Sequence, residues 1–545
     1  MSGAAGATEM PPRGADLVMQ ALAQGGVRTV FALSGNHIMP LFDAALDTGV
    51  RLVHVRHEAA AVHMADAWAR LTGEVGVAMV TGGPGMANAV GALYTCLAGE
   101  SPMLLLSGHA ALSQLGDGAF QELRQAALAE PVAKASWLAA SAAGLPRDIA
   151  RAIRVARAGR PGPVHVALPV DLLDASPKAP ALPDAGSFVP EARPLAEAAA
   201  HAIIAALGAA RRPLIIAPPA LCSREGRRLL AGLAEATGVP VIAMESPRGV
   251  NDPSLGALPE MLASADLIVL AGKPLDYTLG FGKPPTVDAA CRWIVIDPDP
   301  ALIARAARRH APLLAALADP AAAVTALSRA AGGRADPGWR NAVATALARR
   351  PPECDTPPEG ALRHPAAMCR ALRGWLKERP DTVFVSDGGE VGQWAQAMLA
   401  PEERLINGVA GAIGPAIPYA VAAKLARPAA PVLAVLGDGT TGFHLSEFDT
   451  AARYRLPFVA VIGNDARWNA EYQIQLRAYG ADRVQGCTLS PETRYDRAVV
   501  ALGGHGEFVG PGDDLPAALR RAFASDRPAC VNVVIESSPT PTLHR

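Results

Sequence analysis

The 545-residue sequence lacks the features of a nucleic-acid-binding or membrane protein. Its 50 basic and 51 acidic residues almost cancel, and no basic block offers a surface for nucleic acid or for an anionic membrane. No apolar run approaches the roughly 20 residues that a membrane span needs. Aromatic residues make up only 5%, which argues against a stacking surface for single strands. We therefore expect a partner that is neither nucleic acid nor membrane.

Cysteine pairs and secretion signals are also missing. The seven cysteines are scattered and form no CxxC pair, which argues against a disulfide framework or a zinc site. Residues 1–12 lack a basic segment followed by an apolar one, so no signal peptide is predicted. GxSxG, HExxH, GxxxxGK[ST] and a well-placed GxGxxG do not occur. These absences indicate a cytoplasmic protein with reduced thiols.

Short β-branched runs separated by helical stretches extend along most of the chain. This alternation is typical of parallel, doubly wound sheets, and the length suggests about three domains. We predict an α/β fold with three such domains, at residues 1–185, 186–345 and 346–545, joined by linkers near 174–195 and 331–360. The expected strands lie at 27–31, 52–55, 76–80, 103–107, 164–168, 214–216, 241–243, 267–271, 293–297, 383–386, 432–436, 459–462 and 531–535.

Two acidic residues follow apolar runs in the third domain. Asp438 stands between Gly437 and Gly439 after one run, and Asp465 follows the next. Ligands bind beyond the carboxyl ends of strands in open parallel sheets, and a hard divalent cation prefers oxygen ligands. The two residues therefore form a candidate cation site near a phosphate. An acid that merely caps a helix is the alternative.

Further candidates lie at the expected strand ends of the first domain and in one loop of the third. Glu58 begins an apolar helix, residues 82–85 form a glycine turn, and Gln121 precedes a helix. His37 stands beside a glycine turn as a possible proton donor. Residues 408–415 form a small-residue loop that could hold a flat ring. Each also has an ordinary structural interpretation, as a helix cap, a turn or a surface side chain.

Taken together and in this order, the motifs resemble those of thiamine diphosphate (ThDP) enzymes of the acetolactate synthase type. The resemblance covers essentially the whole chain. The motifs that carry it are Arg56-His57-Glu58, Thr81-Gly82-Gly83-Pro84-Gly85, Phe120-Gln121-Glu122, Gly162-Pro163-Val164, Leu168-Pro169-Val170-Asp171, Gly411-Ala412-Ile413-Gly414, Gly437-Asp438-Gly439 and Asn464-Asp465.

The resemblance implies a role for several residues. Asp438, Asp465 and the carbonyl group of Arg467 would hold Mg²⁺, which bridges to the diphosphate of ThDP. Glu58 would hydrogen-bond the aminopyrimidine and promote formation of the C2 ylid. Gln121 would meet the substrate carbonyl, and Ile413 would force the cofactor into its bent shape.

The remaining cofactor contacts implied by the resemblance come from both end domains, which would be the pyrimidine-binding (first) and diphosphate-binding (third) domains. They are Gly82, Gly389, Gly411, Gly439, Thr440 and Trp468. Because these enzymes assemble each site from two subunits, a homodimer or homotetramer is implied.

The sequence departs from the acetolactate synthase pattern at three places. Glu390-Val391 replaces a Gln-His pair, Ile474 replaces a tryptophan of the acceptor pocket, and residues 217–220 replace a glycine-rich flavin turn. These departures weigh against FAD and against acetolactate synthesis. His37 and Trp468 instead resemble residues of benzaldehyde lyase.

The resulting hypothesis is a ThDP- and Mg²⁺-dependent lyase or transferase. It would make or break a C–C bond beside a carbonyl, as a carboligase, lyase or decarboxylase acting on a 2-oxo acid or a 2-hydroxyketone. Acetolactate synthase itself is one alternative. A non-catalytic regulatory module with a ThDP fold is another, and it would be expected to have lost the cofactor residues.

Overall fold

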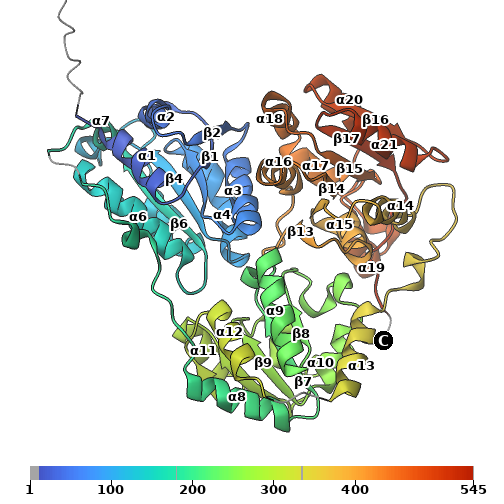
Figure 1. The fold of residues 1–545 in the computed structure, drawn as a ribbon. Coiled ribbons are helices and arrows are strands. Elements are labelled where there is room, and N and C mark those ends of the chain that lie inside the picture. The colour runs from blue at the N-terminus through green and yellow to red at the C-terminus, as the bar shows by residue number, and fades with distance from the viewer. Residues whose placement is uncertain (1–10, 179–180, 333–335, 544–545) are drawn as a thin grey trace, which may run out of the picture.

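The computed structural model describes residues 11–178, 181–332 and 336–543. The chain forms three α/β lobes, with the first and third side by side and the second below them (Figure 1). Each lobe is built on one parallel sheet, which confirms the predicted fold class. The predicted boundaries of the three domains stay predictions, and most of residues 1–12 lies outside the described residues.

The first lobe contains a six-stranded sheet in the order β2-β1-β3-β4-β6-β5. Its central strands are fully buried because helices cover both faces. Its strands are β1 (Thr29–Ala32), β2 (Arg51–His54), β3 (Gly76–Val80), β4 (Met103–His109), β5 (Ala135–Leu138) and β6 (Pro163–Pro169). Its helices are α1 (Gly14–Gln24), α2 (Met39–Ala45), α3 (Glu58–Thr72), α4 (Pro84–Ala98), α5 (Gln125–Ala129), α6 (Leu145–Arg157) and α7 (Val170–Asp174).

The third lobe repeats this strand order, as β13-β12-β14-β15-β17-β16. Its strands are β12 (Val383–Ser386), β13 (Glu403–Ile406), β14 (Val432–Gly437), β15 (Val459–Asn464), β16 (His505–Val509) and β17 (Ala529–Val534). Its helices are α14 (Pro365–Lys377), α15 (Gly389–Met398), α16 (Ala416–Ala426), α17 (Asp438–His444), α18 (Glu447–Tyr454), α19 (Asn469–Tyr479), α20 (Tyr495–Ala501) and α21 (Leu515–Ala524).

The middle lobe holds a five-stranded sheet in the order β11-β10-β9-β7-β8. Its strands are β7 (Pro213–Ala217), β8 (Val241–Ala243), β9 (Leu267–Ala271), β10 (Arg292–Ile296) and β11 (Leu314–Ala316). Its helices are α8 (Glu197–Ala209), α9 (Arg224–Thr237), α10 (Leu258–Ser264), α11 (Pro300–Ala307), α12 (Pro320–Ala330) and α13 (Pro337–Ala348).

Helix α13 corrects one expectation. Residues 331–360 were expected to be a linker, but α13 lies within them and crosses the predicted 345/346 boundary. Trp339, Val343 and Ala346 repeat at helical spacing and are buried. The Trp339 indole N–H also donates to the carbonyl group of Pro213 at 2.8 Å, so the helix packs on the middle lobe.

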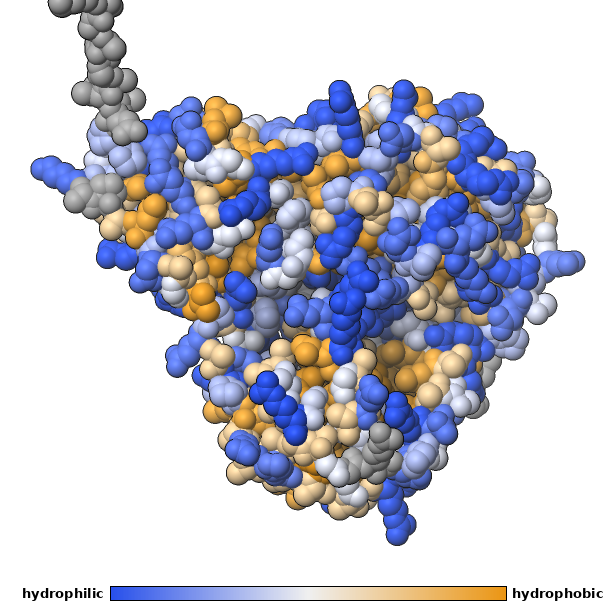
Figure 2. All heavy atoms as spheres, viewed as in Figure 1, coloured by the Kyte–Doolittle hydropathy of each residue, from blue (hydrophilic) through white to orange (hydrophobic). Residues whose placement is uncertain are grey.

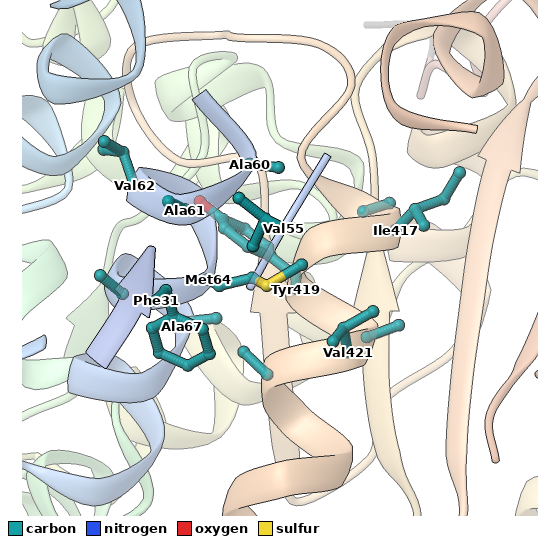
Figure 3. Packing of buried hydrophobic residues seen from close by; sticks show 14 of the residues in the cluster. Phe31, Val55, Ala60, Ala61, Val62, Met64, Ala67, Ile417, Tyr419 and Val421 are labelled. Carbon is teal, nitrogen blue, oxygen red and sulfur yellow. The ribbon is translucent and has the colours of Figure 1, made fainter. Parts of the chain in front are cut away.

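The first and third lobes share one hydrophobic core, formed mainly where α3 packs against α16. Figure 3 shows Val55 and Met64 of the first lobe beside Tyr419 of α16. The Tyr419 hydroxyl donates to the Asp66 carboxylate, so the polar end of this buried tyrosine is satisfied. The two end lobes are therefore held in a fixed arrangement within one chain.

The surface is consistent with the nearly equal numbers of basic and acidic residues. Hydrophilic side chains lie over all three lobes on the face shown in Figure 2. Within the described residues, no helix is long and apolar enough to cross a membrane.

Candidate active site

A cavity lies where the strand order of the third lobe reverses. β12 and β14 are neighbours in the sheet, although β13 separates them in the sequence. Such a reversal opens a crevice at the carboxyl ends of the two strands, and open α/β sheets bind ligands there. Gly389 begins α15 after β12, Asp438 begins α17 after β14, and both line the cavity. The other predicted residues that line it are Ile413, Gly439, Thr440, Asp465, Arg467 and Trp468.

Two carboxylates in this cavity are poorly satisfied by the protein alone. Oδ2 of Asp438 and Oδ2 of Asp465 are buried and have no hydrogen-bond partner among the described residues. Burial raises the pKa of Asp438 to about 6. Burial and then the neighbouring Asp438 carboxylate raise the pKa of Asp465 to about 8. A divalent cation would satisfy both oxygens and remove their mutual repulsion.

The surroundings of this pair fit Mg²⁺ with a diphosphate. Among the described residues, no three His, Cys, Asp or Glu side chains converge to hold a metal. A cation here would therefore need backbone or phosphate oxygens as well. Gly389 has a positive φ of 76° and begins a helix, and helix N-termini bind phosphate. A Cβ on Gly439 would lie 2.8 Å from the Trp468 ring, so only glycine lets the indole lie over this turn.

Ile413 is held in place by a buried acid. Asp387, at the end of β12, accepts backbone hydrogen bonds from Gly388, Gly414 and Ala416 at 2.7–3.2 Å. Burial raises its pKa to about 6 against these bonds. These contacts tie the loop that carries Ile413 to the end of β12.

Thr440, Gly411 and Glu390 differ in how they relate to the cavity. The Thr440 hydroxyl donates to the Gly437 carbonyl group at 3.1 Å, so it is partly committed to the turn. Gly411 adopts a φ of 69° in the loop before Ile413 but does not line the cavity. Glu390 does line it, and its Oε2 atom has no hydrogen-bond partner within the described chain. Burial raises the pKa of Glu390.

The first lobe has a matching reversal between β1 and β3, and the remaining predicted residues gather there. His37 follows β1, and its Nδ1 atom lies 3.2 Å from the Thr81 hydroxyl after β3. The His37 ring also stacks on Phe120, with centroids 6.0 Å apart. Burial, followed by the nearby His109, lowers the pKa of His37. The neutral ring is therefore favoured.

Glu58 and Gln121 complete this second group. Glu58 is buried at the first turn of α3 and accepts a 3.1 Å hydrogen bond from the Asn88 amide of α4. Gln121 has a φ of 58°, and a Cβ on Gly83 would lie 2.7 Å from the Gln121 Cβ. Gly83, beside the predicted Gly82, is thus required for the close approach of the two segments.

The structure gathers the predicted residues into two groups and does not join them within one chain. None of Glu58, Gln121, His37 and Gly82 lines the cavity that holds Asp438 and Asp465. Ile474 also lies outside that lining and is exposed.

The sequence interpretation missed several supporting residues. Asp387 repeats the pattern of Asp438, an acid before glycine at the end of a buried strand, so a signal existed. Asn88 and Gln125 gave none, because their contacts span 30 and 42 residues. Gln125 accepts from the backbone N–H of Gly83 at 2.7 Å.

Comparison with known proteins identifies the class. The N-terminal ThDP-binding domain of thiamine pyrophosphate enzymes matches residues 12–128, the central domain matches 200–327 and the C-terminal ThDP-binding domain matches 387–533. The chain belongs to the ThDP enzyme family.

The relatives carry two different names. An acetolactate synthase large subunit of Mycobacterium tuberculosis is 33% identical, covering 96% of this chain and 95% of its own. The 2-hydroxyacyl-CoA lyases 2 of Danio rerio and Homo sapiens are 29% and 30% identical. They cover 93% and 90% of this chain, and 88% and 84% of their own lengths.

Proposed function

We propose that the protein is a ThDP- and Mg²⁺-dependent enzyme that makes or breaks a C–C bond beside a carbonyl group, on a 2-oxo acid or a 2-hydroxyketone. The pair of buried carboxylate oxygens without partners, on Asp438 and Asp465, is the observation that carries the proposal. The pair lies at a strand-order reversal, between two helix N-termini. It is the donor set expected for Mg²⁺ with a diphosphate.

When bound, ThDP supplies a carbanion and an electron sink. The chain supplies binding, orientation and proton movement. Asp438, Asp465 and the Arg467 carbonyl group would hold the metal, and Ile413 would support the cofactor from the loop that Asp387 fixes. Glu58, oriented by Asn88, would exchange a proton with a ring nitrogen.

The substrate would be handled by the first lobe. Gln121 would donate a hydrogen bond to the carbonyl oxygen of the substrate. His37, kept neutral by its surroundings and held by Thr81, would move a proton at the hydroxyl or carbonyl oxygen.

Lyase or carboligase chemistry is supported over acetolactate synthesis. Glu390 with Val391 and Ile474 replace residues of the acetolactate synthase pattern, whereas His37 and Trp468 resemble those of benzaldehyde lyase. The names of the relatives include both classes. A screen of 2-oxo acids and 2-hydroxyketones with ThDP and Mg²⁺, read by mass, tests this choice. Acetolactate formed from pyruvate would favour the alternative.

The middle lobe supports an enzyme without FAD. Arg160 of the first lobe donates to the Gly272 carbonyl group at 2.8 Å and forms ion pairs with Glu100 and Asp297. These contacts occupy the carboxyl ends of β9 and β10, where a nucleotide would otherwise bind. A flavin absorbance released on denaturation would contradict this part of the proposal.

The active site is proposed to form between two subunits of a homodimer or homotetramer. Glu58 lies apart from the metal pair, and its partner Asn88 lies on the exposed face of α4. A second copy placed against this face would bring its own cavity to Glu58. Every cysteine of the described chain is free and buried, which fits a reducing compartment such as the cytoplasm.

A mixed-subunit experiment tests this assembly. Glu58→Gln and Asp438→Asn should each be inactive alone, because each breaks every site. In a heterodimer, one site combines both changes and the other is intact, so equal mixing should restore about a quarter of the wild-type activity. No recovery in confirmed heterodimers would show that the site lies within one chain.

The non-catalytic alternative expects a protein that does not bind the cofactor. A ligand that binds only the native state raises stability by about 2.7 kcal/mol at 100 times its Kd. We expect ThDP with Mg²⁺, but neither alone to the same extent, to raise the Tm. An unchanged Tm would favour the regulatory module.

A further inference from the structure

His109 ends β4 and is buried, and it has no part in the mechanism above. Its Nε2 atom lies 3.0 Å from the carbonyl oxygen of Leu123, and its Nδ1 atom lies 3.1 Å from that of Ala110. A carbonyl oxygen only accepts hydrogen bonds, so each contact requires an N–H on the ring. A single N–H, on Nε2, is enough for the bond to Leu123.

The bond to Leu123 crosses a loop that carries Gln121. That loop begins after His109 at the end of β4 and ends at Leu123, just before α5, so one side chain joins its two ends. Gln121 has a left-handed backbone there, a conformation that persists only where the surroundings hold it. The Glu122 carboxylate fixes the tip of the loop by accepting from the N–H groups of Gly116 and Ala119 at 2.8 and 3.2 Å.

The same end of β4 packs against His37. A Cβ on Gly108 would lie 2.5 Å from the Cβ of His37. The end of β4 that carries His109 therefore contacts the segment that carries His37. Glu122 and His165 are titratable side chains near His109. Glu58 lies near the neighbouring turn, where a Cβ on Gly85 would contact its Oε1 atom at 3.4 Å. The Glu122 carboxylate accepts from the N–H of Gly116, and the Asp171 carboxylate of α7 accepts from the N–H of Leu112.

We propose that His109 is a positioning residue for the substrate side of the site. Through its hydrogen bond to the Leu123 carbonyl group it holds the loop that presents Gln121. This inference rests on the proposed function for its purpose, but its structural content concerns the first lobe alone. It is therefore tested on the protein without cofactor or substrate.

Two variants test this role. His109→Ala removes the hydrogen bond to Leu123, and His109→Gln keeps an N–H donor for it. Hydrogen exchange read by mass spectrometry should rise about tenfold over residues 115–124 in His109→Ala and stay near wild type in His109→Gln. Unchanged exchange in His109→Ala, with wild-type thermal unfolding, would overturn the positioning role.

Binding of ThDP with Mg²⁺, measured by the rise in Tm, should persist in both variants because the metal pair lies in the third lobe. Failure of all three proteins to bind would instead refute the proposed function.

Discussion

The carboxylate pair predicts that the protein without Mg²⁺ becomes less stable as the pH rises, and that Asp465→Asn removes much of this loss. Burial and the neighbouring Asp438 carboxylate raise the pKa of Asp465 to about 8, from an ordinary value of 3.8. Asparagine keeps an oxygen but has no proton to lose. The substitution therefore removes the like charge while leaving a potential metal ligand in place.

The direction and the size of this change in stability with pH follow from proton linkage. A carboxyl group whose folded pKa lies above its unfolded pKa binds more protons in the folded state, so stability falls as the pH rises from about 4 to about 8. Each pKa unit corresponds to about 1.4 kcal/mol. Raising the pH from 4 to 6 should therefore cost on the order of 3 kcal/mol through Asp465 alone.

Urea unfolding of metal-free protein at pH 5 and pH 7 measures this effect. We expect the free energy of unfolding to fall by a few kcal/mol in wild type and by clearly less in Asp465→Asn. Asp381→Asn, at an exposed position before β12, is the matched control and should behave as wild type. The same pH dependence in all three proteins would refute the reasoning. Saturating ThDP with Mg²⁺ should reduce the wild-type loss at pH 7.

Three further substitutions test other parts of the site. Glu58→Gln should leave the Tm within about 2 °C but lower turnover at least ~100-fold. Turnover is measured with the substrate found by the product screen. Near-normal turnover would exclude a role of Glu58 in proton transfer. Gly414→Ala should lower the free energy of unfolding in urea by roughly 2–3 kcal/mol, since φ is 95° and a Cβ would lie 2.5 Å from a phenylalanine Cβ. Gly442→Ala, in a helix and with open space, is its control and should be neutral or stabilising by up to about 1 kcal/mol. Gly439→Ala should weaken ThDP binding by calorimetry, because the new methyl group displaces the indole over the turn, and unchanged affinity would count against that contact.

The central strands could be predicted from the sequence and several edge strands could not. β5, β11, β13 and β16 were missed, and each lies at the edge of its sheet. An edge strand is covered on fewer sides, so it does not need the continuous apolar run that marks a buried strand. β11 and β16 are mostly partly exposed along their length, whereas β9 and β12 are buried throughout.

The position of a residue relative to a central strand also explains which candidate site residues could be predicted from the sequence. Asp438, Asp465 and His37 stand at the ends of central strands, where a polar residue after an apolar run is visible in one sequence. Gln125 and Asn88 act through contacts with segments far away in the chain. No local pattern encodes such a contact, so only the packed structure reveals it.

The repeated strand order places two separate groups of candidate site residues in one chain. Sheets one and three each have one reversal of strand order next to their first strand, and each reversal holds different chemistry. A twofold axis can set the first lobe of one copy against the third lobe of another. Such an interface contains two equivalent sites, and each site combines one group of residues from each copy. In the proposed assembly, Glu58 of one copy, oriented by Asn88, would meet the cofactor held by Asp438 and Asp465 of another copy.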